Sequence, residues 1–457
     1  MSYAGLIISL VVIVIVARLL LKKYHPHAVL LLAGIFMLIL AGLFDFTLPT
    51  LKKPTGFDGF DLFAYLKESF ADTNSGVGLM IMAIGGFVAY IDKIEASAVL
   101  VKLALKPLAL LKKYPHLSAV MVLPIGQMLF VCIPSAAGLG LLLMASVFPI
   151  LRGLGVSRIS AVSVIAACTA FGIGPASAIT ASAVQIAQAE SVPYFINNQI
   201  PLVWPLTLVL MVSYYFVNRY FDNKEEIAHP HANDPEVKET KAPAVYALIP
   251  LIPLVLLIIF SGIIPFFGTG IKLDTTTAML ISFFIAVVFE AIRTRDVKLV
   301  LNSFKIFWDG MGNIFKTVVT LIIAADIFAQ GLISLGFIDN LVFISQSVGL
   351  GAVGMGVVLT FIIFLASMLM GSGNAAFFAF APLVPNIAAK FGVKSASIIL
   401  PMNLAASMGR TVSPVAGVLI AIAEIAGVTS LDIVKRNIIP FSIAFLVMLL
   451  YHFTLCF

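Results

Sequence analysis

Two polar interruptions in apolar sequence carry the side chains best suited to hold an organic anion. Residues 169–180 place Gly, Pro, Ser and Thr inside a long apolar run, and residues 403–413 place Gly, Ser and Thr inside another, directly before Pro414. Lipid offers no hydrogen bonds, so backbone that leaves a helix at membrane depth must be buried in protein or line a wet cavity. The freed helix ends present N–H groups and the positive end of the helix dipole, both of which attract a carboxylate. The interruptions therefore indicate an anion site.

Two short runs of small residues are typical of the tips of re-entrant helical hairpins. They are residues 134–138 (PSAAG) and 371–374 (GSGN), each set in apolar sequence. If both tips and both interruptions meet at mid-membrane, they form one site. The alternative is that small residues only let membrane helices approach closely. The residues that we expect to bind substrate are Ser135, Ala136, Gly138, Ser372, Gly373, Asn374, Thr169, Asn403, Arg410, Thr411 and Ser413.

Arg410 is the one strong cation among these residues. A guanidinium group matches a carboxylate with two parallel hydrogen bonds. An arginine beside the helix-breaking residues Gly409 and Pro414 is either a ligand or a residue at the membrane surface. We favour the ligand.

Two acidic residues, Asp326 and Glu424, lie within apolar segments. Charge at membrane depth is costly and is functional by default. We therefore treat both acids, together with Asn374, as candidates for binding a coupling ion. Lys316 precedes Asp326, but at their spacing the two side chains occupy different faces of a helix. The alternative for each acid is a buried neutral carboxyl group or an interfacial residue.

The elements that position these residues occur twice. Segments 133–202 and 369–440 share their order of features: a small polar start, an apolar stretch reaching a proline, a Gly-Val turn, a polar break and a closing Ile-Pro. They lie about half a chain apart, as an internal repeat requires. Paired interrupted hydrophobic segments point to the substrate site of a secondary transporter.

Composition fixes the class of protein. Of 457 residues, 61% are apolar and 11% are charged, whereas soluble domains carry about 25% charged residues. Apolar stretches long enough to span a bilayer recur along the chain. The sequence thus predicts an all-α polytopic membrane protein, and its scattered basic residues report topology rather than a nucleic-acid partner.

Two inverted repeats follow from the loop charges, because basic loops that are all cytoplasmic would orient the halves oppositely. The first repeat is 1–217, with a hairpin at 133–157 and a broken helix at 158–189. A polar linker occupies 218–242. The second repeat is 243–457, with a hairpin at 369–393 and a broken helix at 396–426. Segments 59–71 and 299–310 are expected to form short interfacial helices.

The strings GSGNAAFFAF (371–380), NLAASMGRTVSPVAGV (403–418), PSAAGLGLLLMASVFP (134–149) and IFAQGL (327–332) resemble the DcuC family of anaerobic C4-dicarboxylate carriers. The resemblance extends essentially end to end. It implies an inner-membrane carrier of succinate, fumarate or malate, a homodimer and an elevator-like motion. Sodium-coupled relatives in the superfamily carry Ser-Asn-Thr triplets at both tips. Here Ser135-Ala136-Ala137 departs from the triplet, which leaves a sodium site possible near Ser372 and Asn374.

These patterns predict a secondary active transporter of C4-dicarboxylates, coupled to sodium or protons or working by exchange. The alternative keeps the fold and changes the cargo to another organic anion or an amino acid. A channel fits less well, because the polar residues concentrate at hairpins instead of forming rings. Neither a phosphate-binding loop nor a catalytic or metal-ligating set is visible, so we expect neither an enzyme nor a cofactor.

Overall fold

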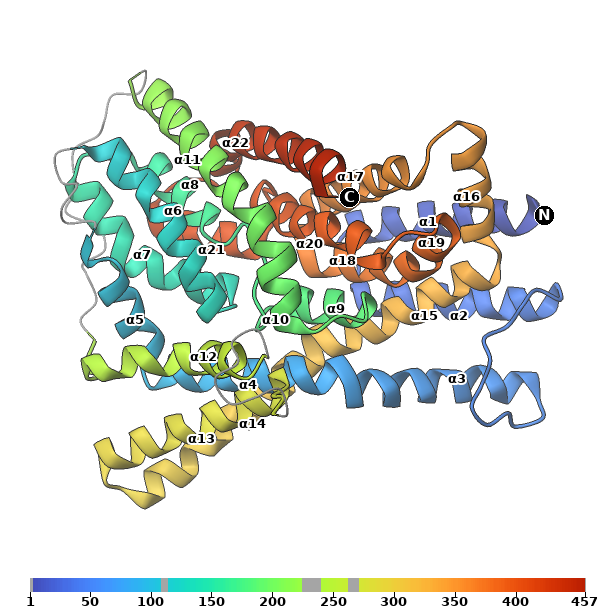
Figure 1. Ribbon diagram of the computed structural model, residues 1–457, viewed down its shortest axis with the longest axis horizontal. Helices are drawn as coiled ribbons and strands as arrows, with labels where there is room; N and C mark the ends of the chain where they lie inside the picture. Colours follow the sequence, from blue (N-terminus) through green and yellow to red (C-terminus); the bar gives the residue numbers. More distant parts are fainter. Residues whose placement is uncertain (1–2, 108–113, 224–239, 262–270, 457) are drawn as a thin grey trace.

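The computed structural model describes residues 3–107, 114–223, 240–261 and 271–456. Within these ranges all regular structure is helical, as predicted (Figure 1). Ten helices among the described residues are long and apolar enough to cross a membrane. The chain is thus a polytopic membrane protein.

The described residues of the first half build eleven α-helices. They are α1 (Tyr3–Leu21), α2 (Pro26–Leu43), α3 (Asp58–Thr73), α4 (Leu79–Lys93), α5 (Ala96–Ala104), α6 (Pro115–Cys132), α7 (Ala136–Gly153), α8 (Arg158–Ala167), α9 (Ala178–Ile186), α10 (Ser191–Tyr194) and α11 (Ile200–Asp222).

The second half builds another eleven among the described residues. They are α12 (Ile252–Ile259), α13 (Thr275–Thr294), α14 (Val297–Ile314), α15 (Thr320–Ser334), α16 (Phe337–Ser347), α17 (Ala352–Met370), α18 (Gly373–Phe380), α19 (Val384–Phe391), α20 (Ser395–Thr411), α21 (Gly417–Ala426) and α22 (Ser430–Tyr451). A 3₁₀ segment (Ala244–Leu251) leads into α12.

Short interfacial helices were predicted at 59–71 and 299–310. Instead, both segments belong to longer continuous helices. α3 continues through a π-helical turn, kinked at Gly76, into α4, and α14 continues likewise into α15. The composite helices contain 36 and 38 residues, and the first is a long blue rod in the lower half of Figure 1, above α13. No proline ends either helix at the junction, so a wider turn absorbs the change of direction.

Glycines let α4 and α14 pack closely. A Cβ atom on Gly310 would lie 2.9 Å from the carbonyl oxygen of Gly85 and 3.0 Å from the Cα atom of Gly86. Small residues at a crossing bring two backbones together, which is the main source of contact energy between helices in lipid.

Each hairpin has two helical arms with a short tip. α6 and α7 meet at residues 133–135, and α17 meets α18 at residues 371–372. The ranges 133–157 and 369–393 therefore hold only the tip, the second arm and the turn that follows. The first arms are α6, which the sequence analysis had taken for an independent crossing, and α17.

The broken helices occupy the centre of the fold. α8 ends at Ala167 and its continuation α9 begins at Ala178, whereas α20 ends at Thr411 and α21 begins at Gly417. Both breaks contain a proline, Pro175 or Pro414, which cannot continue a helix without losing a hydrogen bond. α18 and α20 lie in the middle of Figure 1, and most residues of α8 and α20 are buried.

Candidate functional site

The two helix breaks contact each other directly. The backbone N–H of Gly172, in the first break, donates to the Ser407 hydroxyl oxygen of α20 at 3.1 Å. The guanidinium of Arg410 donates to the carbonyl oxygen of Thr169 at 2.6 Å. The structure therefore brings together predicted residues from both halves of the chain.

Arg410 is partly committed to this backbone contact. Thr169 lies just beyond the C-terminus of α8, where carbonyl groups lack partners within the helix. The Nε atom of Arg410 is buried and has no hydrogen-bond partner among the described residues. One side of the guanidinium thus stabilises the break, while the rest retains donors for a carboxylate.

Gln199 ties the breaks together from a third element, the turn that precedes α11. Its side-chain oxygen accepts from Gly174 N–H at 3.0 Å. Its amide nitrogen donates to the Thr180 hydroxyl at 2.9 Å and to the Asn403 side-chain oxygen at 3.4 Å. Sequence reasoning missed Gln199, although a polar pattern at 197–199 (NNQ) before an apolar helix was a signal for it.

Asn403 is fully buried, and its Nδ2 group has no hydrogen-bond partner among the described residues. A buried donor without a partner is costly. This amide therefore remains available for an acceptor such as a carboxylate oxygen.

The serine at each hairpin tip caps the helix behind it. Ser135 accepts from the N–H of Gly138 at 3.1 Å, and Ser372 accepts from the N–H of Ala375 at 3.2 Å. Both are N-caps, which satisfy one of the free N–H groups at a helix start. Neither hydroxyl donates a hydrogen bond to a described residue, so each can donate to a ligand. Ala136 is half-buried beside the first cap.

The second tip packs against α20 and its break. A Cβ atom on Gly373 would lie 2.6 Å from the carbonyl oxygen of Ala406. Gly371 has φ +72°, and a Cβ there would lie 2.8 Å from the backbone of Val415. Asn374 is half-buried at the same tip, so its side-chain oxygen and that of Ser372 are the groups open to a cation there.

The first tip faces a carboxylate that the sequence analysis did not single out. A Cβ atom on Gly138 would lie 3.5 Å from Oδ2 of Asp92. Asp92 lies near the end of α4 and accepts a hydrogen bond from Ser97 at 2.5 Å through its other oxygen. The left-handed conformation of Glu95, with φ 64°, turns the chain from α4 into α5 here. This turn is unusual for a residue with a side chain.

Thr411 and Ser413 form contacts within the second break. The Thr411 hydroxyl donates to the carbonyl oxygen of Ser407 at 3.0 Å, and its own carbonyl accepts from Asn437 at 3.0 Å. The Ser413 hydroxyl accepts from Val415 N–H at 3.4 Å. These two residues are buried and shape the break.

The coupling-ion candidates Asp326 and Glu424 occupy other positions. Asp326 accepts from the Ser69 hydroxyl at 3.0 Å, which connects α15 to α3. Glu424 is exposed on α21. Of the three candidates, only Asn374 lies at a hairpin tip.

A cavity of about 400 Å³ opens beside the second half of the first broken helix. It is lined by Gln185 of α9, by Gly76 at the kink between α3 and α4, and by the start of α13. Lys272 and Glu190 pair at 2.9 Å on its wall. A larger cavity of about 560 Å³, between α2 and α3, contains none of the predicted site residues.

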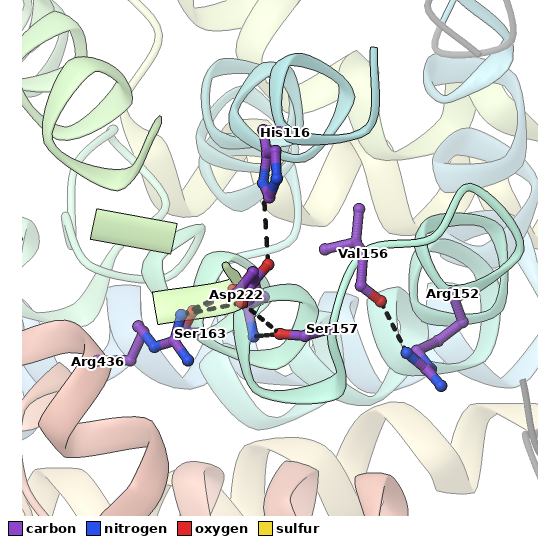
Figure 2. A network of polar contacts seen from close by, with 8 residues as sticks. His116, Arg152, Val156, Ser157, Ser163, Asp222 and Arg436 are labelled. Atoms are coloured by element: carbon purple, nitrogen blue, oxygen red, sulfur yellow. Dashed lines mark hydrogen bonds and ion pairs between the residues drawn. The ribbon is translucent and has the colours of Figure 1, made fainter. Parts of the chain in front are cut away.

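A buried polar cluster fixes the opposite end of α8 (Figure 2). Asp222, the last residue of α11, accepts from the hydroxyls of Ser157 and Ser160, each at 2.7 Å. It also pairs with Arg436 of α22 at 3.1 Å. Carboxylate and guanidinium are almost fully buried, a costly arrangement unless the charges are paired. The cluster joins α8, α11 and α22 into one unit.

Known proteins resemble the chain in sequence and in fold. The family model for the C4-dicarboxylate anaerobic carrier DcuC matches residues 4–456. An anaerobic C4-dicarboxylate transporter DcuC of Escherichia coli K12 is 33% identical over 96% of this chain and 94% of its own. A probable DcuC transporter of Vibrio cholerae is 35% identical over 95% and 94%.

Two solved transporter structures share the fold. MtrF of Neisseria gonorrhoeae, described among a class of antimetabolite efflux pumps, superposes with a TM-score of 0.66 at 14% identity, covering 94% of this chain and 95% of its own. The YdaH transporter of Alcanivorax borkumensis gives a TM-score of 0.59 at 12% identity, covering 94% and 98%. At this identity the likeness concerns fold alone.

The spanning helices and the relatives agree on a multi-pass protein of the inner membrane. The family model matches nearly the whole chain and the relatives are up to 35% identical. Both findings confirm the family that the sequence strings indicated. The chain belongs to the DcuC family of anaerobic C4-dicarboxylate carriers.

Proposed function

We propose that this protein is a secondary active transporter of C4-dicarboxylates such as succinate, fumarate and malate. The observation that carries the proposal is the position of Arg410, whose guanidinium joins the two breaks and keeps a buried, unpaired Nε donor. The names of the relatives support the cargo.

A dianion needs a favourable partner at each end. One carboxylate would bind Arg410 and the free Nδ2 donor of Asn403. The other would lie at a hairpin tip, where Ser135 or Ser372 donates through its hydroxyl beside a helix N-terminus. Polar groups fixed in a water-poor site bind strongly because they need no reorganisation.

We infer that the two halves are inverted repeats and that the carrier moves as an elevator. Supporting this, α6, α7, α8, α9 and α11 have counterparts in order in α17, α18–α19, α20, α21 and α22. Contacts also correspond, since α2 packs on α15 as α13 packs on α4. The hairpins, broken helices, α11 and α22 would form the moving block, framed by the two long helices.

Coupling and assembly belong to the same proposal. Sodium bound near Ser372 and Asn374, a proton carried by an acidic residue, or exchange of one dicarboxylate for another would each drive the cycle. We expect a homodimer, as the family resemblance implies. The mass of the solubilised protein, corrected for bound detergent, tests the assembly and should be that of two chains.

Counterflow in proteoliposomes tests the function. Vesicles loaded with unlabelled fumarate should take up labelled fumarate, and succinate and malate should compete. Absence of counterflow under sodium, proton and zero gradients would overturn the assignment. The panel should include tricarboxylates and amino acids, because stronger competition by one of these would favour the alternative carrier of another organic anion or an amino acid.

A further inference from the structure

One wall of the cavity beside α9 joins the moving block to its frame. α10 connects α9 to α11 and so belongs to the block, whereas α13 packs on α4 and α14. Glu190, directly before α10, pairs at 2.9 Å with Lys272, which lies just before α13. The Thr275 hydroxyl donates to the Ser191 hydroxyl at 3.4 Å, so the first residues of the two helices also touch.

The same contact buries a small apolar cluster. Val192 of α10, Leu257 of α12 and Ala278 of α13 are each at most 5% exposed. This cluster is separate from the core that includes α8 and α20 and from the core that includes α4 and α14. The ion pair beside it is open to solvent, with the Lys272 and Glu190 side chains 76% and 61% exposed, and exposed pairs contribute little stability. Contacts with few buried apolar groups open most readily, which suits a contact that breaks in every transport cycle.

The cavity leads from this contact toward the proposed binding site. Its lining runs from the exposed pair to Ala181 of α9, which is buried. Ala181 directly follows Thr180, whose hydroxyl donates to the carbonyl oxygen of Gly172 and accepts from Gln199. The cavity of about 400 Å³ thus ends one residue from the network that joins the two helix breaks.

The contact lies on the side of the membrane opposite the linker. α13 ends at the basic residues Arg293 and Arg295, which predict a cytoplasmic end. The helix therefore begins at the outer side, where Lys272 and Thr275 meet α10. An opening at this point would connect the outer solution with the cavity.

We propose that Glu190 and Ser191, held against Lys272 and Thr275, form an outer gate that is closed in this structure. The outer gate rests on the proposed transport function and on the elevator motion inferred with it. A block that moves past α13 carries α10 with it, so the paired atoms cannot stay within hydrogen-bond distance in both end states. Their separation opens the cavity and gives a dicarboxylate access to the network at Thr180.

The test joins the two helices covalently through Ser191→Cys and Thr275→Cys. The hydroxyl oxygens that the sulfur atoms replace lie 3.4 Å apart, close enough for a disulfide bond of about 2.05 Å after a small rotation of the side chains. Oxidation should stop fumarate counterflow, and a reductant should restore it. Fumarate should still raise the melting temperature of the oxidised protein, because the network around Thr180 is unchanged.

Two controls separate arrest of the motion from damage to the protein. Oxidation should leave each single-cysteine variant at its own reduced rate, which excludes a contribution from the native cysteines. Thr429→Cys with Asp432→Cys places a disulfide within the block alone, where the Thr429 hydroxyl donates to Asp432 at 2.6 Å, and oxidation should not change its rate. A cross-linked Ser191→Cys/Thr275→Cys protein that exchanges fumarate at its reduced rate would overturn the outer gate. Arrest with loss of the fumarate-induced melting shift would overturn it as well.

Glu190→Cys with Lys272→Cys repeats the test at two exposed positions, where the substitutions leave the buried cluster intact. A short bis-maleimide should join these cysteines and likewise arrest counterflow. If neither pair cross-links in folded protein, α10 does not meet α13 and the outer gate is refuted. If wild type exchanges no dicarboxylate, the proposed function fails, whereas the yield of the two cross-links still decides the contact: its formation supports the outer gate and its absence refutes it.

Discussion

The guanidinium of Arg410 donates to the carbonyl oxygen of Thr169 at 2.6 Å, across 241 residues of sequence. This bond joins the two broken helices at the points where each leaves its helical path. An arginine placed there neutralises carbonyl groups at the end of α8 and presents its remaining donors to the same region. The breaks are therefore one polar centre, to which both halves of the chain contribute.

Gln199→Leu should destabilise this centre. The change leaves the buried N–H of Gly174 without its partner, which costs about 1 to 3 kcal/mol, and it removes the donor to the Thr180 hydroxyl, which keeps its own bond to the carbonyl oxygen of Gly172. We expect a lower melting temperature in detergent and slower transport. Gln346→Leu, on an exposed face of α16, is the matched control. Equal melting temperatures for the two variants would show that Gln199 does not hold the breaks together.

Gly373→Ala should displace the second hairpin tip. The new Cβ would lie 2.6 Å from the carbonyl oxygen of Ala406, a fixed backbone atom that cannot yield without moving α20. We expect at least a tenfold loss of counterflow, because misplacing a binding group by about 1 Å costs of the order of 10²-fold in rate. Gly153→Ala meets nothing within 4 Å and should transport normally. Wild-type transport by Gly373→Ala would mean that the tip does not pack this way in the working cycle.

Asp92→Asn should strengthen dicarboxylate binding. The Asp92 carboxylate faces the first hairpin tip near Gly138, so it repels an anion bound at Ser135. Two like charges about 4 Å apart in water repel each other by about 1 kcal/mol. Removing the Asp92 charge should therefore lower KM several-fold. Asp309→Asn, on an exposed face of α14, should leave KM unchanged. If both variants keep the wild-type KM, the anion does not approach Asp92.

Asp326→Asn should alter the pH or cation dependence of uptake. Asparagine can still accept the hydrogen bond from Ser69, so the variant removes the charge and retains the contact between α15 and α3. Ser69→Ala removes the bond and keeps the charge, which separates the two effects. Initial uptake rates measured across pH and sodium concentration provide the comparison. An unchanged profile in Asp326→Asn would show that Asp326 takes no part in ion coupling and has a structural role.

Much of the architecture could be predicted because glycine and proline mark it in the sequence. Pro175 and Pro414 each lie in a polar, glycine-containing interruption of an apolar run, and proline together with glycine disfavours a continuous helix, so both breaks could be located. The arms of the hairpins were harder. α6 has the length and composition of an ordinary spanning helix, and only its packing against α7 and α8 shows that it is an arm.

The contacts between the breaks could not be predicted from residue types. Ser407 and Gln199 look ordinary in sequence, and their roles depend on how α20 and the turn before α11 are rotated toward partners far along the chain. Glu424 shows the same limit. It corresponds to Gln185 when the prolines are aligned, yet the rotation of α21 leaves it exposed.

The most direct measurement of the central claim is fumarate counterflow by Arg410→Ala beside Arg410→Lys and Arg219→Ala, at equal reconstitution and with melting temperatures recorded. Removing a buried charged partner costs about 2 to 5 kcal/mol, so we predict at least a 30-fold loss of apparent affinity in Arg410→Ala. Arg410→Lys should recover part of it, and Arg219→Ala should match wild type. A folded Arg410→Ala protein that exchanges fumarate with wild-type affinity would contradict a dicarboxylate site at the junction of the two broken helices.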